Sequence, residues 1–302
     1  MKNALSYYYN LTPVDIHQYN KQFKFTINQD KYVLMPYERN VDDINYLYEI
    51  AIQLFQSQIY CHQFVFNTSR SLLTYINNEP YVLLKVYVDD NSKIILNDII
   101  NFGNNSQTTV KNILKRDNWF QLWSDKIDYF EYQISQFGKK YPIIRKSFSY
   151  FVGLAETGIM LHKNVNNSSN NTLFIGHKRI KKNYTIFDLY NPLNFIIDLK
   201  VRDASEFFKE KFFENHDTLA EVIYYISYAN LTSYDCLMLY TRLLFPSFYF
   251  DIYEEIINEG KDEENLLPIL EKVDDYEQFL KDLYIYLKEI INIPDIEWLK
   301  KT

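Results

Sequence analysis

The residues that could do chemistry lie between positions 172 and 208. His177 follows an apolar run, and the carboxylates Asp188 and Asp198 come later in the same segment. This order of groups is typical of a phosphotransferase loop, in which an aspartate orients and deprotonates the attacking hydroxyl. Here the third residue of the His-x-x core is Arg179, and a guanidinium has no acceptor atom and keeps its proton. The segment therefore has the layout of such a loop and lacks its base.

The distribution of glycine also bears on nucleotide binding. The chain has six glycines, and none lies before Gly103. A loop that cradles phosphates needs glycine, because only glycine lets backbone N–H groups approach the phosphates closely. If a nucleotide binds, something other than a glycine loop in the first 102 residues must hold it.

The composition bounds the class of protein. A chain of 302 residues with 47% hydrophobic and 24% charged residues is typical of a soluble globular protein. A net charge of −7 argues against a nucleic-acid partner. The two cysteines, Cys61 and Cys236, indicate a reducing compartment or buried thiols, and they suit neither a disulfide framework nor a metal knuckle. No apolar run reaches the roughly 18 residues that span a bilayer, so we expect a cytoplasmic protein.

The hydrophobic periodicity predicts an α+β chain with two lobes. In the first part of the chain, alternating apolar residues predict strands at 22–26, 32–37, 63–66, 71–75 and 81–88. A helical spacing predicts one helix among these strands, at 42–58. Spacings of three to four predict helices at 107–137, 150–162, 204–214, 218–229, 233–245, 250–258 and 275–291, with a polar loop at 164–171. We therefore expect a β-rich N-terminal lobe over residues 1–88 and a mainly helical C-terminal lobe over 89–302.

Three segments together resemble one family. They read YFVGLAETG at 150–158, FIIDLKVRDASEFFK at 195–209 and LYTRLLFPSFYFDIYEEI at 239–256. In this order they resemble the YutH-type spore-coat-associated proteins, relatives of CotS within the aminoglycoside phosphotransferase branch of the protein-kinase-like superfamily. The resemblance extends over residues 20–291 and implies a bilobal kinase-like fold. It also implies a place at the spore coat if the host sporulates.

The catalytic loop can be compared with this family residue by residue. The resemblance implies His-x-Asp, then an Asn five residues after that Asp. His177 matches, although a buried histidine after an apolar strand is often only a hydrogen-bonded core residue. The base position holds Arg179, the fifth residue after it is Tyr184, and Asn183 is one place out of register. We therefore expect His177, Arg179 and Asn183 to form a degenerate loop.

The nucleotide and metal groups implied by the resemblance are only partly present. A second metal-binding aspartate is implied, and the spacing leaves both Asp188 and Asp198 open. The ATP-anchoring lysine should lie inside the strand YVLMPYE, which has only Lys31 at its edge, and Glu49 on the next helix would be its acidic partner. Lys85 lies on a later strand, where we favour a solvent-facing side chain.

Arg202, Asp203 and Glu206 form the R-D-x-x-E pattern that the resemblance gives to a structural brace. We expect Asp203 to stand at a helix N-terminus, where a carboxylate accepts a backbone N–H and interacts favourably with the helix dipole. Glu206, three residues later, would complete half of a capping box.

Two functions are compatible with these residues. The first is a pseudokinase that binds a protein partner or a small ligand in the interlobe cleft, without a cofactor, a metal, a nucleic acid or a membrane span. The alternative is an active phosphotransferase that uses ATP and a hydroxyl acceptor. In the alternative, Asp188 and Asp198 hold Mg²⁺, and Lys85 is a candidate nucleotide ligand.

Overall fold

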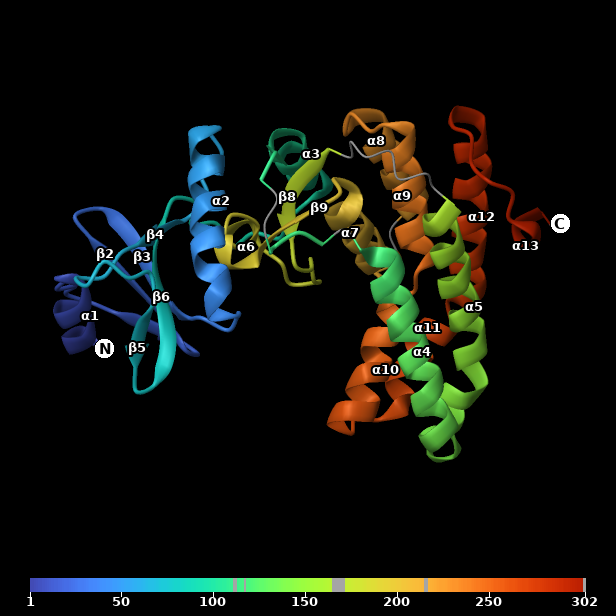
Figure 1. Cartoon of the computed structure of the whole chain (residues 1–302), viewed down its shortest axis with the longest axis horizontal. Helices are drawn as coiled ribbons and strands as arrows, with labels where there is room; N and C mark the ends of the chain where they lie inside the picture. Colours follow the sequence, from blue (N-terminus) through green and yellow to red (C-terminus); the bar gives the residue numbers. More distant parts are fainter. Residues whose placement is uncertain (111–112, 117, 165–171, 215–216, 301–302) are drawn as a thin grey trace. The chain divides into compact units, whose positions relative to one another are not determined.

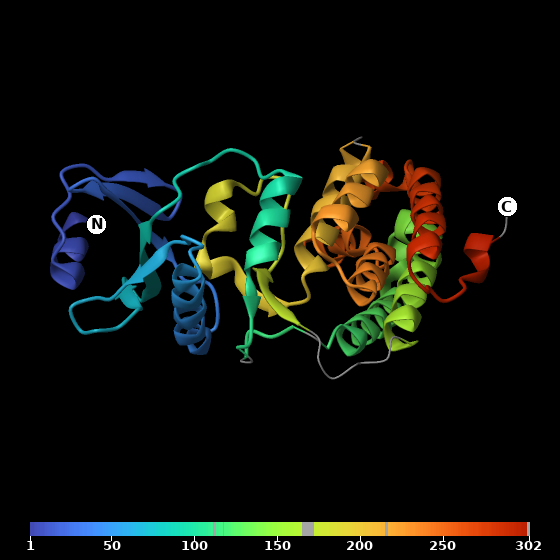
Figure 2. The same ribbon diagram turned by 90° about the horizontal axis from the view of Figure 1, so that it is seen from above.

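The computed structural model describes residues 1–110, 113–116, 118–164, 172–214 and 217–300. Apart from position 164, the predicted polar loop 164–171 lies outside these residues. The chain forms two compact units, seen in two views in Figures 1 and 2. The first comprises Met1–Lys115, Leu173–Arg179 and Asn183–Asp198, and the second comprises Arg116–Thr172, Ile180–Lys182 and Leu199–Thr302. The predicted lobe boundary at residue 88 falls inside the first unit.

An antiparallel sheet forms the core of the first unit. Its strands are β1 (His17–Tyr19), β2 (Gln22–Ile27), β3 (Asp30–Pro36), β4 (Gln63–Val65), β5 (Thr74–Ile76) and β6 (Glu79–Val86). Their order is β1-β2-β3-β6-β4, and β5 pairs with β6 outside this path. Two-residue turns at Asn28–Gln29 and Asn77–Asn78 join β2 to β3 and β5 to β6, and all four turn residues have positive φ. Such turns match the twist of the strands that they connect.

The two faces of this sheet are covered by different helices. α1 (Lys2–Tyr9) packs against one face, where Leu5 contacts the cluster that contains Phe25, Leu34 and Leu83. α2 (Ile44–Gln56) lies on the other side of the sheet in both views (Figures 1 and 2). Apolar residues at spacings of three and four give α2 its buried stripe, as the sequence predicts.

A second, three-stranded sheet carries the phosphotransferase-like segment. It consists of β7 (Gln107–Thr108), β8 (Leu173–His177) and β9 (Phe195–Asp198) in that order, all antiparallel. The first unit also contains α3 (Leu96–Asn105) and the short α6 (Ile186–Leu189). Backbone bonds join α6 to the rest of the unit, including Phe187 N to the Asp90 carbonyl at 2.7 Å.

Several helix predictions were wrong at their start: the helices predicted from 150 and 204 begin earlier, at Pro142 and Val201, and another begins later. The helix predicted over 107–137 begins only at Trp119, as α4 (Trp119–Phe137). Gln107 and Thr108 instead pair with Phe174 and Leu173 of β8. β-branched residues such as Thr108 favour an extended strand over a helix.

The second unit is helical, as its periodicity predicts. Its other helices are α5 (Pro142–Asn164), α7 (Val201–Phe213), α8 (Thr218–Tyr228), α9 (Ser233–Leu244), α10 (Ser247–Glu259), α11 (Leu267–Leu270), α12 (Val273–Ile290) and α13 (Glu297–Lys300). α9 is the central helix, and its residues from Cys236 to Leu244 are all buried. Gly158 on α5 permits a close approach, because a Cβ atom there would lie 3.1 Å from the Thr241 carbonyl.

Candidate functional site

His177 is the last residue of β8 and lies in the core of the first unit. Its side chain is fully buried, and Nε2 lies 2.9 Å from the Leu189 carbonyl oxygen. The Phe102 ring packs against the imidazole at a centroid distance of 4.9 Å. These contacts fix the ring between a backbone carbonyl and an aromatic side chain, which is a structural role.

The turn after β8 holds residues that the resemblance assigns to the catalytic loop. It is anchored by a backbone bond of 2.8 Å from Lys178 N to the Asn194 carbonyl. Arg179 is half-buried in this turn, and Asn183 is exposed. The position that the resemblance gives to the base is therefore a half-buried cation.

The two candidate metal carboxylates have different surroundings. Asp188 lies in the first turn of α6, where its carboxylate accepts hydrogen bonds from Thr185 N at 3.0 Å and Thr185 Oγ1 at 2.8 Å. It completes a capping box, which occupies one of its oxygens. Asp198 ends β9, is fully buried and lies opposite Phe174. Of the two, only Asp198 stands at a strand end.

No three-residue metal centre is found in the part of the chain that the structure describes. Neither Asp188 nor Asp198 belongs to a group of three or more His, Cys, Asp or Glu side chains placed to hold an ion. A metal bound at Asp198 would therefore depend on ligands beyond such a group, for example a bound phosphate.

The lysines expected near a nucleotide are paired at the surface. Lys85 Nζ donates to Asp30 at 2.7 Å, and this hydrogen bond raises the pKa of Lys85. Lys85 lies opposite Tyr32 in the sheet, on the face that carries the α1 cluster. Lys31 is bound to Asp89 at 2.5 Å. Lys85 therefore lies in a surface ion pair.

Sequence reasoning missed Lys24, which lies inside an early strand. It is on β2, directly opposite Val33 of the strand in which a lysine was sought. Its ammonium group lies 4.7 Å from the centre of the Phe187 ring. The alternation of Phe23, Lys24 and Phe25 was the available signal, because it places the lysine on the face opposite the two rings.

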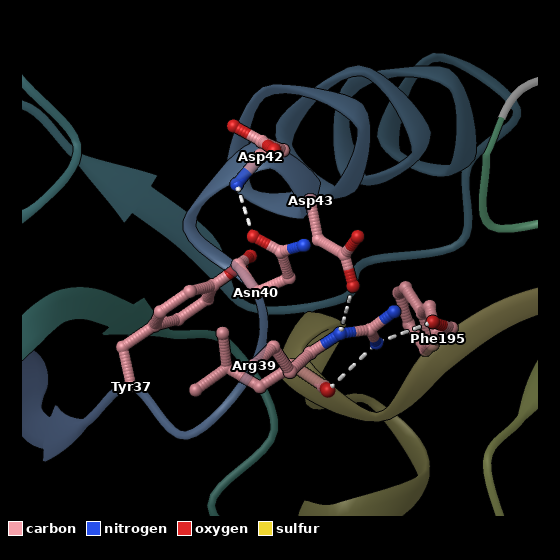
Figure 3. Close-up of polar contacts among 7 residues, drawn as sticks. Tyr37, Arg39, Asn40, Asp42, Asp43 and Phe195 are labelled. Carbon is pink, nitrogen blue, oxygen red and sulfur yellow. Dashed lines mark hydrogen bonds and ion pairs between the residues drawn. The ribbon is translucent and has the colours of Figure 1, made fainter.

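Sequence reasoning also missed Arg39, whose contacts are drawn in Figure 3. The side chain is 4% exposed, and Nε donates to Asp43 Oδ2 at 3.0 Å. Nη1 donates to the carbonyls of Leu193 at 3.1 Å and Phe195 at 2.7 Å. The guanidinium thus fixes the segment before α2 to the first residue of β9. No local sequence pattern reveals the two carbonyl partners.

The predicted capping role of Asp203 is wrong. α7 begins at Val201 with Lys200 at its N-cap, so Asp203 is the third residue of the helix. Lys200 already has helical backbone angles, so the helix starts at Val201, two residues before Asp203. Asp203 is buried in the first turn, where a carboxylate still interacts favourably with the helix dipole.

Arg202 and Lys209 connect α7 with other helices of the second unit, and Glu206 binds Lys209 within α7. The Arg202 guanidinium lies 4.7 Å from the Trp119 ring of α4. Glu206 forms an ion pair of 3.1 Å with Lys209, whose Nζ also donates to Ser247 of α10 at 2.8 Å. These contacts support a bracing role for the R-D-x-x-E segment.

Comparison with known proteins identifies a family. The family model described as "Spore coat putative kinase YutH" matches residues 2–283. The endospore coat-associated protein YutH of Bacillus subtilis (strain 168) is 25% identical over 278 residues, which are 82% of this chain and 81% of that protein.

Comparison with solved structures identifies the fold. An aminoglycoside phosphotransferase from Alicyclobacillus acidocaldarius superposes with a TM-score of 0.70 at 11% identity, over 96% of this chain and 97% of that chain. Spectinomycin phosphotransferase in complex with ADP and spectinomycin gives 0.59 at 11% identity, over 96% and 93% of the two chains. Choline kinase LicA from Streptococcus pneumoniae gives 0.52 at 12% identity, over 94% and 98%. The chain has the bilobal kinase-like fold.

Proposed function

Because this chain belongs to the spore coat putative kinase YutH family, we propose that it is a coat-associated kinase-like protein that binds and does not transfer phosphate. The name of the Bacillus subtilis relative supports the location. No helix among the residues described here is both long and apolar enough to cross a membrane. We infer attachment to the coat through a protein partner.

The observation that carries the proposal is the turn after β8. Arg179 occupies the position that the resemblance assigns to the base, and an arginine has no acceptor for the proton of a hydroxyl. His177 does not replace the base, because it is buried and bonded to the Leu189 carbonyl. Asp188 is bonded to Thr185 in a capping box.

The expected loss of transition-state stabilisation supports the absence of phosphoryl transfer. Losing a single preorganised electrostatic group in an active site commonly costs about 2.7–4 kcal/mol of transition-state stabilisation. The chain lacks the base at Arg179 and also a glycine loop in residues 1–102. Two such losses together reduce the rate by several orders of magnitude.

The competing function is an ATP-dependent phosphotransferase with a rearranged site. The position of Asp198 at the end of β9 favours this second function, because a metal-binding carboxylate is expected at the end of a strand. In that function Arg179 would act as an electrostatic clamp and not as a base.

A phosphoryl-transfer assay separates the two functions. The full chain is incubated with Mg-ATP and a panel of aminoglycosides, choline and coat extract, and ADP release is measured, with an active aminoglycoside phosphotransferase as positive control. We expect no ADP release above the blank. Release that disappears in Asp198→Asn and persists in Asp188→Asn would contradict the proposal and establish the enzyme.

A further inference from the structure

A pocket of about 440 Å³ lies within the first unit, beside β1, β2 and β3. Its lining includes Lys24, Lys31, Tyr32, Val86 and Phe187. This volume is within the usual range for small-molecule sites, which combine apolar walls with a few polar groups. Of the residues considered from the sequence for a nucleotide or metal site, Lys31 lines it, whereas Lys85, Asp188 and Asp198 do not.

The register of the sheet explains why polar groups gather here. His17 of β1 lies opposite Lys24 of β2, and Thr26 of β2 lies opposite Lys31 of β3. Residues opposite one another in an antiparallel sheet share a face, and alternate residues along a strand share it too. These four side chains are therefore on one face of the sheet.

The charges of the pocket are distributed unevenly. Lys31 is neutralised by Asp89 at 2.5 Å. For Lys24 the described part of the chain provides no hydrogen bond or ion pair to Nζ, only the face of the Phe187 ring at 4.7 Å. A lysine held over an aromatic ring keeps its charge and can still donate to an anion.

Phe187 packs against a second buried ring. The His62 ring packs against it at a centroid distance of 4.5 Å, and His62 is fully buried. Burial lowers the pKa of His62 to about 4, so this imidazole is neutral at pH 7. The pocket therefore has a rigid aromatic wall and, beside it, a cation for which the residues described by the structure provide no carboxylate partner.

We propose that this pocket binds a small organic monoanion with a flat apolar part. Its anionic group contacts Lys24, and its apolar part packs against Phe187 and Val86. The inference deepens the proposed binding function and rests on it.

The two carboxylates of the pocket disfavour a ligand with more than one negative charge. Asp15 and Asp89 line the same pocket as Lys24 and Lys31, so the four charges cancel. A multiply charged ligand would meet the two carboxylates, whereas a carboxylate or a phosphodiester adds only one charge beside Lys24. A carboxylate and a phosphodiester each carry one negative charge, and the probes described below distinguish them.

Calorimetric titration of the full chain tests the proposal. The probes are benzoate for a carboxylate, methyl phenyl phosphate for a phosphodiester, and benzamide as the neutral analogue of benzoate. We expect at least one of the two anions to bind about 10-fold more tightly than benzamide, as one charged hydrogen bond allows. Equal binding of all three probes, or binding of none, would overturn the proposal.

Variants locate the binding at Lys24. Lys24→Met keeps the aliphatic stem and should weaken the bound anion about 10-fold, and Lys24→Arg should restore binding. The matched control is Lys21→Met, because Lys21 is exposed, pairs with Glu79 and does not line the pocket. Anion binding that Lys24→Met leaves unchanged, with a normal unfolding midpoint, would overturn the proposal.

The calorimetric test and the ADP-release assay distinguish failure of the pocket assignment from failure of the proposed function. ADP release together with Lys24-dependent anion binding would contradict the absence of phosphoryl transfer and leave the pocket assignment intact. Absence of both ADP release and anion binding would overturn the pocket assignment alone.

Discussion

The Arg39 guanidinium donates a hydrogen bond of 2.7 Å to the carbonyl oxygen of Phe195, 156 residues further along the chain. The same side chain binds Asp43 just before α2. It therefore fixes the strand that ends at Asp198 to the N-terminal part of the first unit (Figure 3).

Replacing Arg39 by Met should lower the free energy of unfolding by about 3 kcal/mol. The substitution leaves the partly buried Asp43 carboxylate and two carbonyls without the buried Arg39 donor, and removing one partner of such a pair is strongly destabilising. Urea denaturation measures the change. Arg145→Met, at an exposed position of α5, is the control and should change stability by less than about 0.5 kcal/mol. Equal effects of the two substitutions would refute the role of Arg39.

Asp203→Ala should lower the free energy of unfolding by about 1 kcal/mol or more. The substitution removes a buried carboxylate from the first turn of α7, where the helix dipole favours negative charge. Asp275→Ala is a matched control, because Asp275 is also the third residue of its helix, α12, and is exposed. The two unfolding midpoints are compared in urea. A midpoint unchanged by Asp203→Ala would contradict a bracing role.

The buried His62 should make the protein less stable at acidic pH. Burial lowers its pKa in the folded state from 6.5 to about 4. As the pH falls below 6.5, the unfolded chain takes up a proton that the folded chain does not, so stability decreases until about pH 4. The loss from this group is about 3 kcal/mol at most.

Urea denaturation between pH 7 and pH 4, on the native chain and on His62→Gln, measures this contribution. The native chain should lose more stability over this range than the variant. A parallel decrease in both proteins would show that His62 does not titrate as described.

The two thiols should be inert in the folded protein. Cys61 and Cys236 are free and buried, as the sequence predicts. Burial raises the pKa of Cys61 to about 12 and that of Cys236 to about 11, and only thiolates react with disulfide reagents. Both should react with 5,5′-dithiobis(2-nitrobenzoate) at pH 8 only after unfolding. Rapid labelling under native conditions would contradict their burial.

Much of the fold could be predicted from the sequence, because it follows local periodicity. The helical spacing in α2 and α12 and the strand alternation in β2 each reflect one buried face. The short helix α1 was not predicted, and neither was β7. β7 has only two residues, and its pairing with β8 is a long-range contact that no local pattern encodes.

The candidate site was predictable only where it depends on a motif. The loop that contains His177 and Arg179 follows from residue types in order. The role of Asp188 depends on its bonds to Thr185, and the position of Lys24 depends on the register of β2. The partners of Arg39 are backbone carbonyls, which have no sequence signature.

Titration of the full chain with Mg-ATP in a calorimeter, at millimolar concentrations, tests the central claim most directly. We expect no binding heat and no increase in the unfolding temperature, since a ligand that binds the folded state must stabilise it. Clear binding that is lost in Asp198→Asn would contradict the account, because it would show a working nucleotide and metal site.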